Sequence, residues 1–115
     1  MVASVVPVII TETKYVENSQ TTQSPTVASG DVLEIDKCTV SNNTGGAVSF
    51  AANVVPNGGS AGASNLVISR NVAAGKVDKC PELVGRKLAA GSVISTLAGA
   101  ASSLVIRMEG RLITL

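Results

Sequence analysis

Apolar and polar residues alternate with a period of two along most of this chain. Val, Ile and Thr dominate the short alternating runs, and Gly, Asn, Ser and Pro separate them. This pattern is typical of antiparallel strands that have one face on a core and the other in water. We predict about seven or eight strands, over residues 3–10, 31–41, 47–55, 65–72, 76–80, 92–98 and 102–115.

The spacing of these strands predicts the fold class. Turn signals recur at short intervals, and helices do not alternate with strands as they do in parallel α/β folds. We therefore expect an all-β antiparallel β-sandwich, jelly-roll-like in its strand content. One segment, 81–89, predicts a short helical turn, with Pro81 at its first position and Glu82 near its positive end.

The chain of 115 residues is expected to form a single domain with two parts. Residues 1–30 would supply an N-terminal strand and a polar loop or arm over 17–30. The strand is expected at a sheet edge, because Pro7 cannot donate a ladder hydrogen bond. Residues 31–115 would form the sandwich core.

The apolar residues predict a thin core. Hydrophobic residues make up 45% of the chain, but it has one Phe, one Tyr and no Trp. Aromatic side chains bury the most area per residue. In the strand 47–55, Val48, Phe50, Ala52 and Val54 are expected on the inner face. We infer that contacts in a homo-oligomer or larger assembly add to stability.

Three segments share the form Ala-small-Gly-x-Val, at 28–32, 73–77 and 89–93. Each comes directly before a predicted strand. The pattern predicts tight turns in which Gly30, Gly75 and Gly91 take a backbone conformation that other residues resist. No Gly-Lys-Ser/Thr sequence occurs, so a phosphate-binding loop is not indicated.

Both cysteines end the same tripeptide, Asp-Lys-Cys, at 36–38 and 78–80. In each segment an apolar residue precedes the cysteine by three positions, which breaks strict alternation. A β-bulge at the Asp-Lys step would return both apolar side chains to the core. We therefore predict two bulges, with Cys38 and Cys80 as core thiols. A disulfide between them and a reactive thiol are the alternatives.

The inventory of titratable groups argues against an enzyme. The chain has no histidine, and two cysteines alone make a poor zinc site. Glu34 and Asp36 share a strand face and could form a carboxylate pair, but a solvated sheet face is the favoured interpretation, because no other group converges on them. No catalytic residue, metal ligand, cofactor site or small-molecule substrate is predicted.

Net charge is +1, and the basic residues are scattered. No nucleic-acid footprint is indicated, and no apolar run reaches the length of a membrane span. The N-terminus lacks the charged region of a signal peptide, which predicts a protein made in a cytoplasm. Tyr15 is the one plausible aromatic platform for a sugar, so a glycan-binding module stays an alternative.

Several ordered elements together resemble small β-sandwich structural proteins of tailed bacteriophages. Val-Ser-Asn ends one strand, and the next strand runs into Pro-x-Gly-Gly-Ser. Ala-Ala-Gly, Pro-Glu-Leu-x-Gly, Leu-x-x-Gly-x-x-Ile and Met-Glu-Gly follow in order. The match covers roughly residues 31–113 and depends on order and spacing, while the polar stretch 17–30 fits it least.

The resemblance implies a virion structural protein with no catalytic residues. Within that class we expect a capsid decoration or cement protein that binds the major capsid protein and its own copies. It would be assembled in the bacterial host cytoplasm. A neck, collar, tail or fibre component is the alternative. The N-terminal strand and residues 17–30 would then be arms that pair with a neighbouring subunit.

Overall fold

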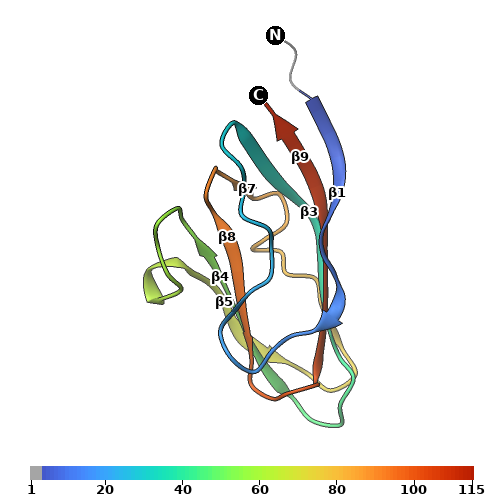
Figure 1. Cartoon of the computed structure of the whole chain (residues 1–115). Coiled ribbons are helices and arrows are strands. Elements are labelled where there is room, and N and C mark those ends of the chain that lie inside the picture. The colour runs from blue at the N-terminus through green and yellow to red at the C-terminus, as the bar shows by residue number, and fades with distance from the viewer. Residues whose placement is uncertain (1–3) are drawn as a thin grey trace.

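A computed structural model describes residues 4–115, and these residues form a sandwich of two antiparallel sheets (Figure 1). Nine strands are present, and one 3₁₀ turn, η1 (Ala63–Asn65), is the helical element of the described chain. The prediction of an all-β sandwich is confirmed. The start of the first predicted strand, at residue 3, lies outside the described residues.

The larger sheet has the order β1-β9-β3-β6, and β7 also pairs with β3. The smaller sheet has the order β2-β8-β4-β5. The strands of the larger sheet are β1 (Ser4–Tyr15), β3 (Asp31–Asn42), β6 (Val77–Asp78), β7 (Lys87–Leu88) and β9 (Leu104–Thr114). Those of the smaller sheet are β2 (Thr21–Thr22), β4 (Val48–Val55), β5 (Leu66–Val72) and β8 (Val93–Ala98).

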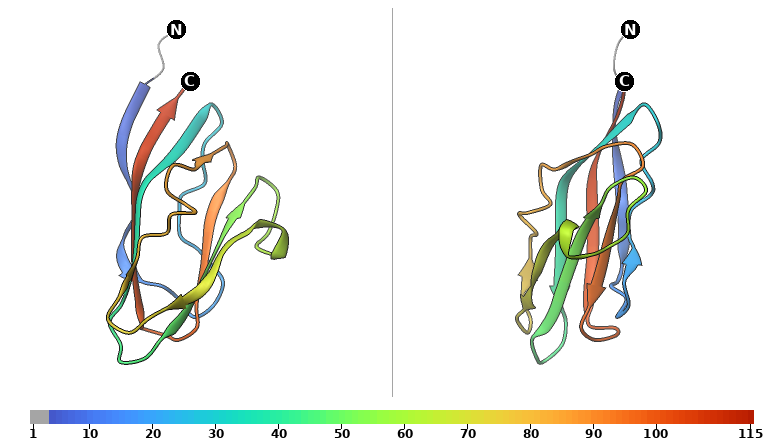
Figure 2. Two further views of the ribbon diagram at one scale, coloured as in Figure 1. Left: turned by 180° about the vertical axis from the view of Figure 1, so that it is seen from behind. Right: turned by 90° about the vertical axis from the view of Figure 1, so that its left-hand side faces the viewer.

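The molecule is elongated, with extents of 52 × 26 × 19 Å. The two sheets lie close together at one end and separate toward the end that holds the termini (Figure 2). There the chain between β6 and β8 passes between them, and its Leu83 and Leu88 side chains are buried. Ser4 pairs with Thr114, so the two ends of the described chain are adjacent.

The core is almost entirely aliphatic, with Phe50 as its single aromatic side chain. The predicted inner face of β4 is confirmed: Val48, Phe50 and Ala52 are buried, and Val54 is half-buried and packs against the core. Val54 lies opposite the buried Ile94 of β8, and the pairing with β8 continues without a register shift.

Asn53 is buried on the opposite face of β4, and its amide donates to the Gly62 carbonyl oxygen (3.0 Å) and to Asn65 Oδ1 (2.8 Å). The Asn65 amide in turn donates to the Ser60 carbonyl oxygen at 2.9 Å. Hydrogen bonds therefore tie the glycine-rich loop 56–64 to β4.

The predicted helical turn at 81–89 does not continue as a helix. The amides of Leu83 and Val84 both donate to the Cys80 carbonyl oxygen, which makes one turn. Gly85 then has a φ of +84°, and its amide donates to the Ile35 carbonyl oxygen of β3. This hydrogen bond to β3 ends the turn, and the chain continues along β3 as β7.

The N-terminal strand and the segment 17–30 both pack against the sandwich of their own chain. β1 lies at the edge of the larger sheet, as Pro7 predicts. The segment 17–30 contains β2, which pairs with β8, and it buries Gln23, Ser24 and Val27. Thr11 Oγ1 donates to the Gln23 carbonyl oxygen (2.9 Å), so the polar segment is attached to β1 as well.

Candidate interaction surface

The edge strand β1 carries a concentration of exposed apolar side chains. Val5, Val6, Ile9 and Tyr15 are 55%, 49%, 52% and 53% exposed. One side of β1 pairs with β9, and the other side is the edge of the sheet. Proteins usually protect such an edge with charges, bulges, proline or a covering segment. Over residues 4–9 of β1, Pro7 is the one residue of these protective kinds.

Two bulges lie on either side of β9 at the same level and shape this edge. β1 has an extra residue between Ile9 and Thr11, and β3 has one between Ile35 and Lys37, both near Glu109. A Cβ atom at Gly110 would overlap the Glu34 carbonyl oxygen and lie 2.9 Å from Ile10 Cδ1. Glycine is therefore required where the three strands approach.

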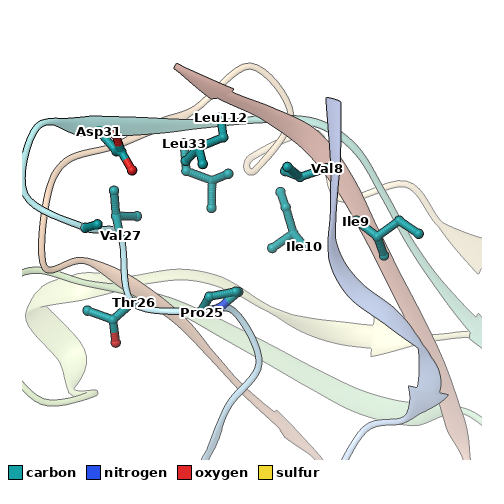
Figure 3. Close-up of a pocket in the computed structure, with 10 residues that line it drawn as sticks. Val8, Ile9, Ile10, Pro25, Thr26, Val27, Asp31, Leu33 and Leu112 are labelled. Atoms are coloured by element: carbon teal, nitrogen blue, oxygen red, sulfur yellow. The ribbon is translucent and has the colours of Figure 1, made fainter. Parts of the chain in front are cut away.

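An apolar pocket of about 280 Å³ lies beneath the first half of β1. Figure 3 shows Val8, Ile10, Leu33 and Leu112 around it, while Ile9 points to the other side of β1. The segment 25–28 closes the opposite wall, and Asp31 contributes the pocket's carboxylate. A strand added to the edge of β1 would place its inward side chains beside Val8 and Ile10, over this pocket.

The outer face of the larger sheet is a charged face built on β9. Arg107, Glu109 and Arg111 alternate there with the inward-facing Ile106, Met108 and Gly110. Arg107 bonds Glu12 of β1 and Glu109, and its hydrogen bond to Glu109 raises the pKa of the guanidinium. The Arg107–Glu12 ion pair joins β9 to β1.

The candidate carboxylate pair, Glu34 and Asp36, lies on this charged face. Arg111 binds both, with Nη2 2.5 Å from Glu34 Oε2 and Nε 3.0 Å from Asp36 Oδ2. Lys87 Nζ lies 3.5 Å from Glu34 Oε1. The pair is held by cations in an open sheet face, and this geometry provides no site for acid–base chemistry.

The three predicted turn glycines occupy equivalent positions. The amides of Asp31, Lys76 and Ser92 donate to the carbonyl oxygens of Ala28, Ala73 and Ala89 at 3.0–3.1 Å. Gly30, Gly75 and Gly91 are the third residues of these turns, with φ of +86°, +69° and +83°. A positive φ at this position defines a type II turn, which favours glycine. These turns lead into β3, β6 and β8.

The two cysteines are free, and their side chains are 1% (Cys38) and 0% (Cys80) exposed. The bulge predicted at Asp36-Lys37 is present, and it places Ile35 and Cys38 on the inner face. The second predicted bulge is wrong. β6 ends at Asp78, and Cys80 reaches the core through a φ of +48° in the following turn.

An ionic cluster next to Cys80 is not predicted from the sequence. Arg70 of β5 bonds Glu82 and both carboxylate oxygens of Asp78, at 2.6 and 2.8 Å. The hydrogen bond from Arg70 lowers the pKa of Asp78. Asp78 Oδ1 also accepts from the Cys80 amide (2.8 Å). Only the turn after β6 brings these residues together, so no local pattern signals them.

Residues 4–115 contain no group of three or more side chains that could hold a metal ion. No helix in that range is long and apolar enough to cross a membrane. Tyr15, the candidate sugar platform, is exposed at the end of β1.

Comparisons with known proteins give structural neighbours only. No family model and no curated protein match the chain. A structure of infectious bursal disease virus, Gx strain, has a TM-score of 0.43 and 10% identity, over 97% of this chain and 32% of that one. The VP2 subviral particle of the same virus has a TM-score of 0.40 and 12% identity, over 96% and 32%. The chain thus spans about a third of the length of these viral proteins.

Proposed function

We propose that this chain is a non-enzymatic structural protein of a bacteriophage virion. Its specific role would be capsid decoration, in which it binds the major capsid protein and its own copies. The ordered motifs over residues 31–113 support this class. The exposed apolar edge of β1 is the observation that carries the proposal, because it is a surface for binding another chain.

The edge of β1 fits a strand-addition contact. An incoming strand would satisfy the backbone groups on the edge and would cover Val5, Val6 and Ile9. The pocket beneath Val8 and Ile10 would accept apolar side chains from the same strand. Each copy would then bury surface at a joint of the shell and strengthen it without any chemical step.

The charged face supports a scaffold role. Its arginines form two clusters of ion pairs: Arg107 of β9 binds Glu12 of β1, and Arg111 of β9 binds Glu34 and Asp36 of β3. Each exposed pair contributes little alone, but the two clusters link β1 to β9 and β9 to β3, and together they oppose shearing between these strands. A sheet held in this way can transmit load between neighbouring subunits.

The proposal is tested by locating the protein in particles. Virions with and without the chain would be compared by negative-stain microscopy, with an antibody against the chain as the label. Decoration predicts label over the whole head and lower resistance of the deleted particles to heat or osmotic shock.

Label confined to the neck, collar or tail would replace decoration by the alternative structural role. Particles that lack the protein altogether would contradict the virion proposal. Retention on a glycan column that is lost in Tyr15→Ala would favour the sugar-binding module instead.

A further inference from the structure

The two cysteines lie near the same pair of antiparallel strands. β3 and β6 pair Ser41 with Val77 and Val40 with Asp78. β6 ends at Asp78, and Cys80 follows two residues later in the turn, while Cys38 lies two residues before Val40 on β3. The Val40–Asp78 pair therefore brings the two cysteines to the same end of the ladder, and both side chains are buried in one hydrophobic cluster.

The Cys38 thiol beside Cys80, together with burial, raises the pKa of the Cys80 thiol. Both thiols are buried and both are free. Directly opposed residues of antiparallel strands, such as Val40 and Asp78, have Cα atoms about 4.5–5.5 Å apart. Disulfides span Cα separations of about 4.4–6.8 Å, so two cysteines that follow this pair at the same end of the ladder are placed where a bond can form.

We propose that Cys38 and Cys80 are an oxidation site that a low-molecular-weight disulfide, such as oxidised glutathione, converts to an intramolecular cross-strand disulfide. The bond would join β3 to the start of the 80–85 turn. It would form when the protein leaves a reducing compartment, where free thiols persist. The inference concerns the sandwich itself and is independent of the proposed virion role.

The reaction proceeds in two exchange steps. One protein thiolate attacks a sulfur atom of oxidised glutathione, breaks its S–S bond and releases one glutathione. The second protein thiolate then attacks the mixed disulfide at the protein sulfur and releases the second glutathione. Two protein thiols are oxidised, one glutathione disulfide is reduced to two thiols, and these take up the two protons.

Access controls the rate of this reaction. The thiols are buried, and only a thiolate attacks, so oxidation requires the turn after β6 to open. Asp78 holds that turn closed through its bond to the Cys80 amide and its ion pair with Arg70. Once formed, the disulfide encloses the chain from β3 to the turn and restricts the unfolded state.

The test uses the native full-length chain incubated with oxidised or reduced glutathione. Free thiols would be counted after denaturation, and peptides would be mapped by mass spectrometry. We expect the two thiols to disappear without added glutathione mass, and a cross-linked peptide pair containing Cys38 and Cys80. The oxidised protein should unfold at least tenfold more slowly, and a reductant should reverse this change.

Three results would overturn the proposal: two thiols that persist in oxidised glutathione, a stable mixed disulfide, or disulfide-linked dimers as the main product. Cys38→Ala serves as a control and should stop at the mixed disulfide. If Cys38→Ala does not fold, Asp78→Asn provides a second test. It keeps both thiols and should speed oxidation severalfold, whereas an unchanged rate would show that the turn does not control access.

Discussion

At Gly110 the absence of a Cβ atom allows β1, β9 and β3 to pack closely together. Gly110 faces the core between the two bulges, against the Glu34 carbonyl group and Ile10. We expect Gly110→Ala to destabilise the fold by about 2–3 kcal/mol, because the added methyl group forces the backbone of β3 away.

The prediction is checked by the midpoint of urea unfolding. Gly45→Ala is the matched control, since a Cβ there meets nothing within 4 Å and its φ is not in the left-handed region. Equal midpoints for the two variants would show that the strands at Gly110 can separate at little cost.

Asp78 predicts a pH-dependent contribution to stability. Its bond to Arg70 lowers its pKa in the folded state below the ordinary value of 3.8. The carboxylate therefore stabilises the fold above pH 3.8, and this contribution is lost as pH falls through the folded-state pKa. Asp78→Asn should cost about 1–2 kcal/mol at pH 7 and progressively less in acid.

Denaturant unfolding at pH 7 and in the acid range measures this difference. Arg70→Met in the wild-type and Asp78→Asn backgrounds completes a double-mutant cycle. A penalty for Asp78→Asn that stays constant with pH would assign the effect to the Cys80 amide bond and not to the carboxylate charge.

Some of these residue roles can be predicted from the sequence. The three-residue spacing of Ile35 and Cys38 predicts a bulge, because a bulge is the local way to keep both inside. Val77 and Cys80 have the same spacing, but β6 ends between them, and the following turn directs the Cys80 side chain into the core. Arg70 and Gly110 act through partners distant in the chain, so their roles follow only from the strand pairing.

At the scale of elements, β1 is the strand most open to a partner. Ile9→Lys should abolish or greatly weaken self-association and particle binding, because a charge on the edge disfavours an added strand. Val77→Lys is the matched control, since Val77 is equally exposed (53%) but lies in β6. Analytical ultracentrifugation and co-sedimentation with particles measure the outcome, and equal behaviour of the two variants would remove β1 from the interface.

The long strands are predictable because each alternates over many residues. β2, β6 and β7 have two residues each, too few to carry a period. The segment 81–89 has a helical start at Pro81-Glu82, yet contacts with β3 direct it into β7. The local helical preference of this segment is overridden there by hydrogen bonds to β3, which is distant in the sequence.

At the scale of the molecule, the aliphatic core predicts stability that depends on assembly. We expect the unfolding temperature to rise with protein concentration, because association stabilises the folded state by mass action. Differential scanning calorimetry over a hundredfold concentration range tests this. An unfolding temperature that is high and independent of concentration would show that the single chain is stable without a partner.

Period-two alternation is sufficient to predict the sandwich, but it does not determine strand order. The pocket beside β1 needs β9 between β1 and β3, and it needs the segment 25–28 folded back across the sheets. Neither the strand order nor the position of the segment 25–28 can be predicted from a local sequence pattern. The sequence resemblance indicates a class of protein, and the strand pairing shows the exposed edge of β1, which we propose as its contact surface.

The pairing of Ser4 with Thr114 has a consequence for engineering. Two adjacent ends allow the whole domain to be inserted into a surface loop of another protein with little separation of that loop's stems. They also allow a short peptide to join the ends while new termini are opened in the loop 56–62. Such a permutant would make β1 one arm of a β9–β1 hairpin, tethered at both ends.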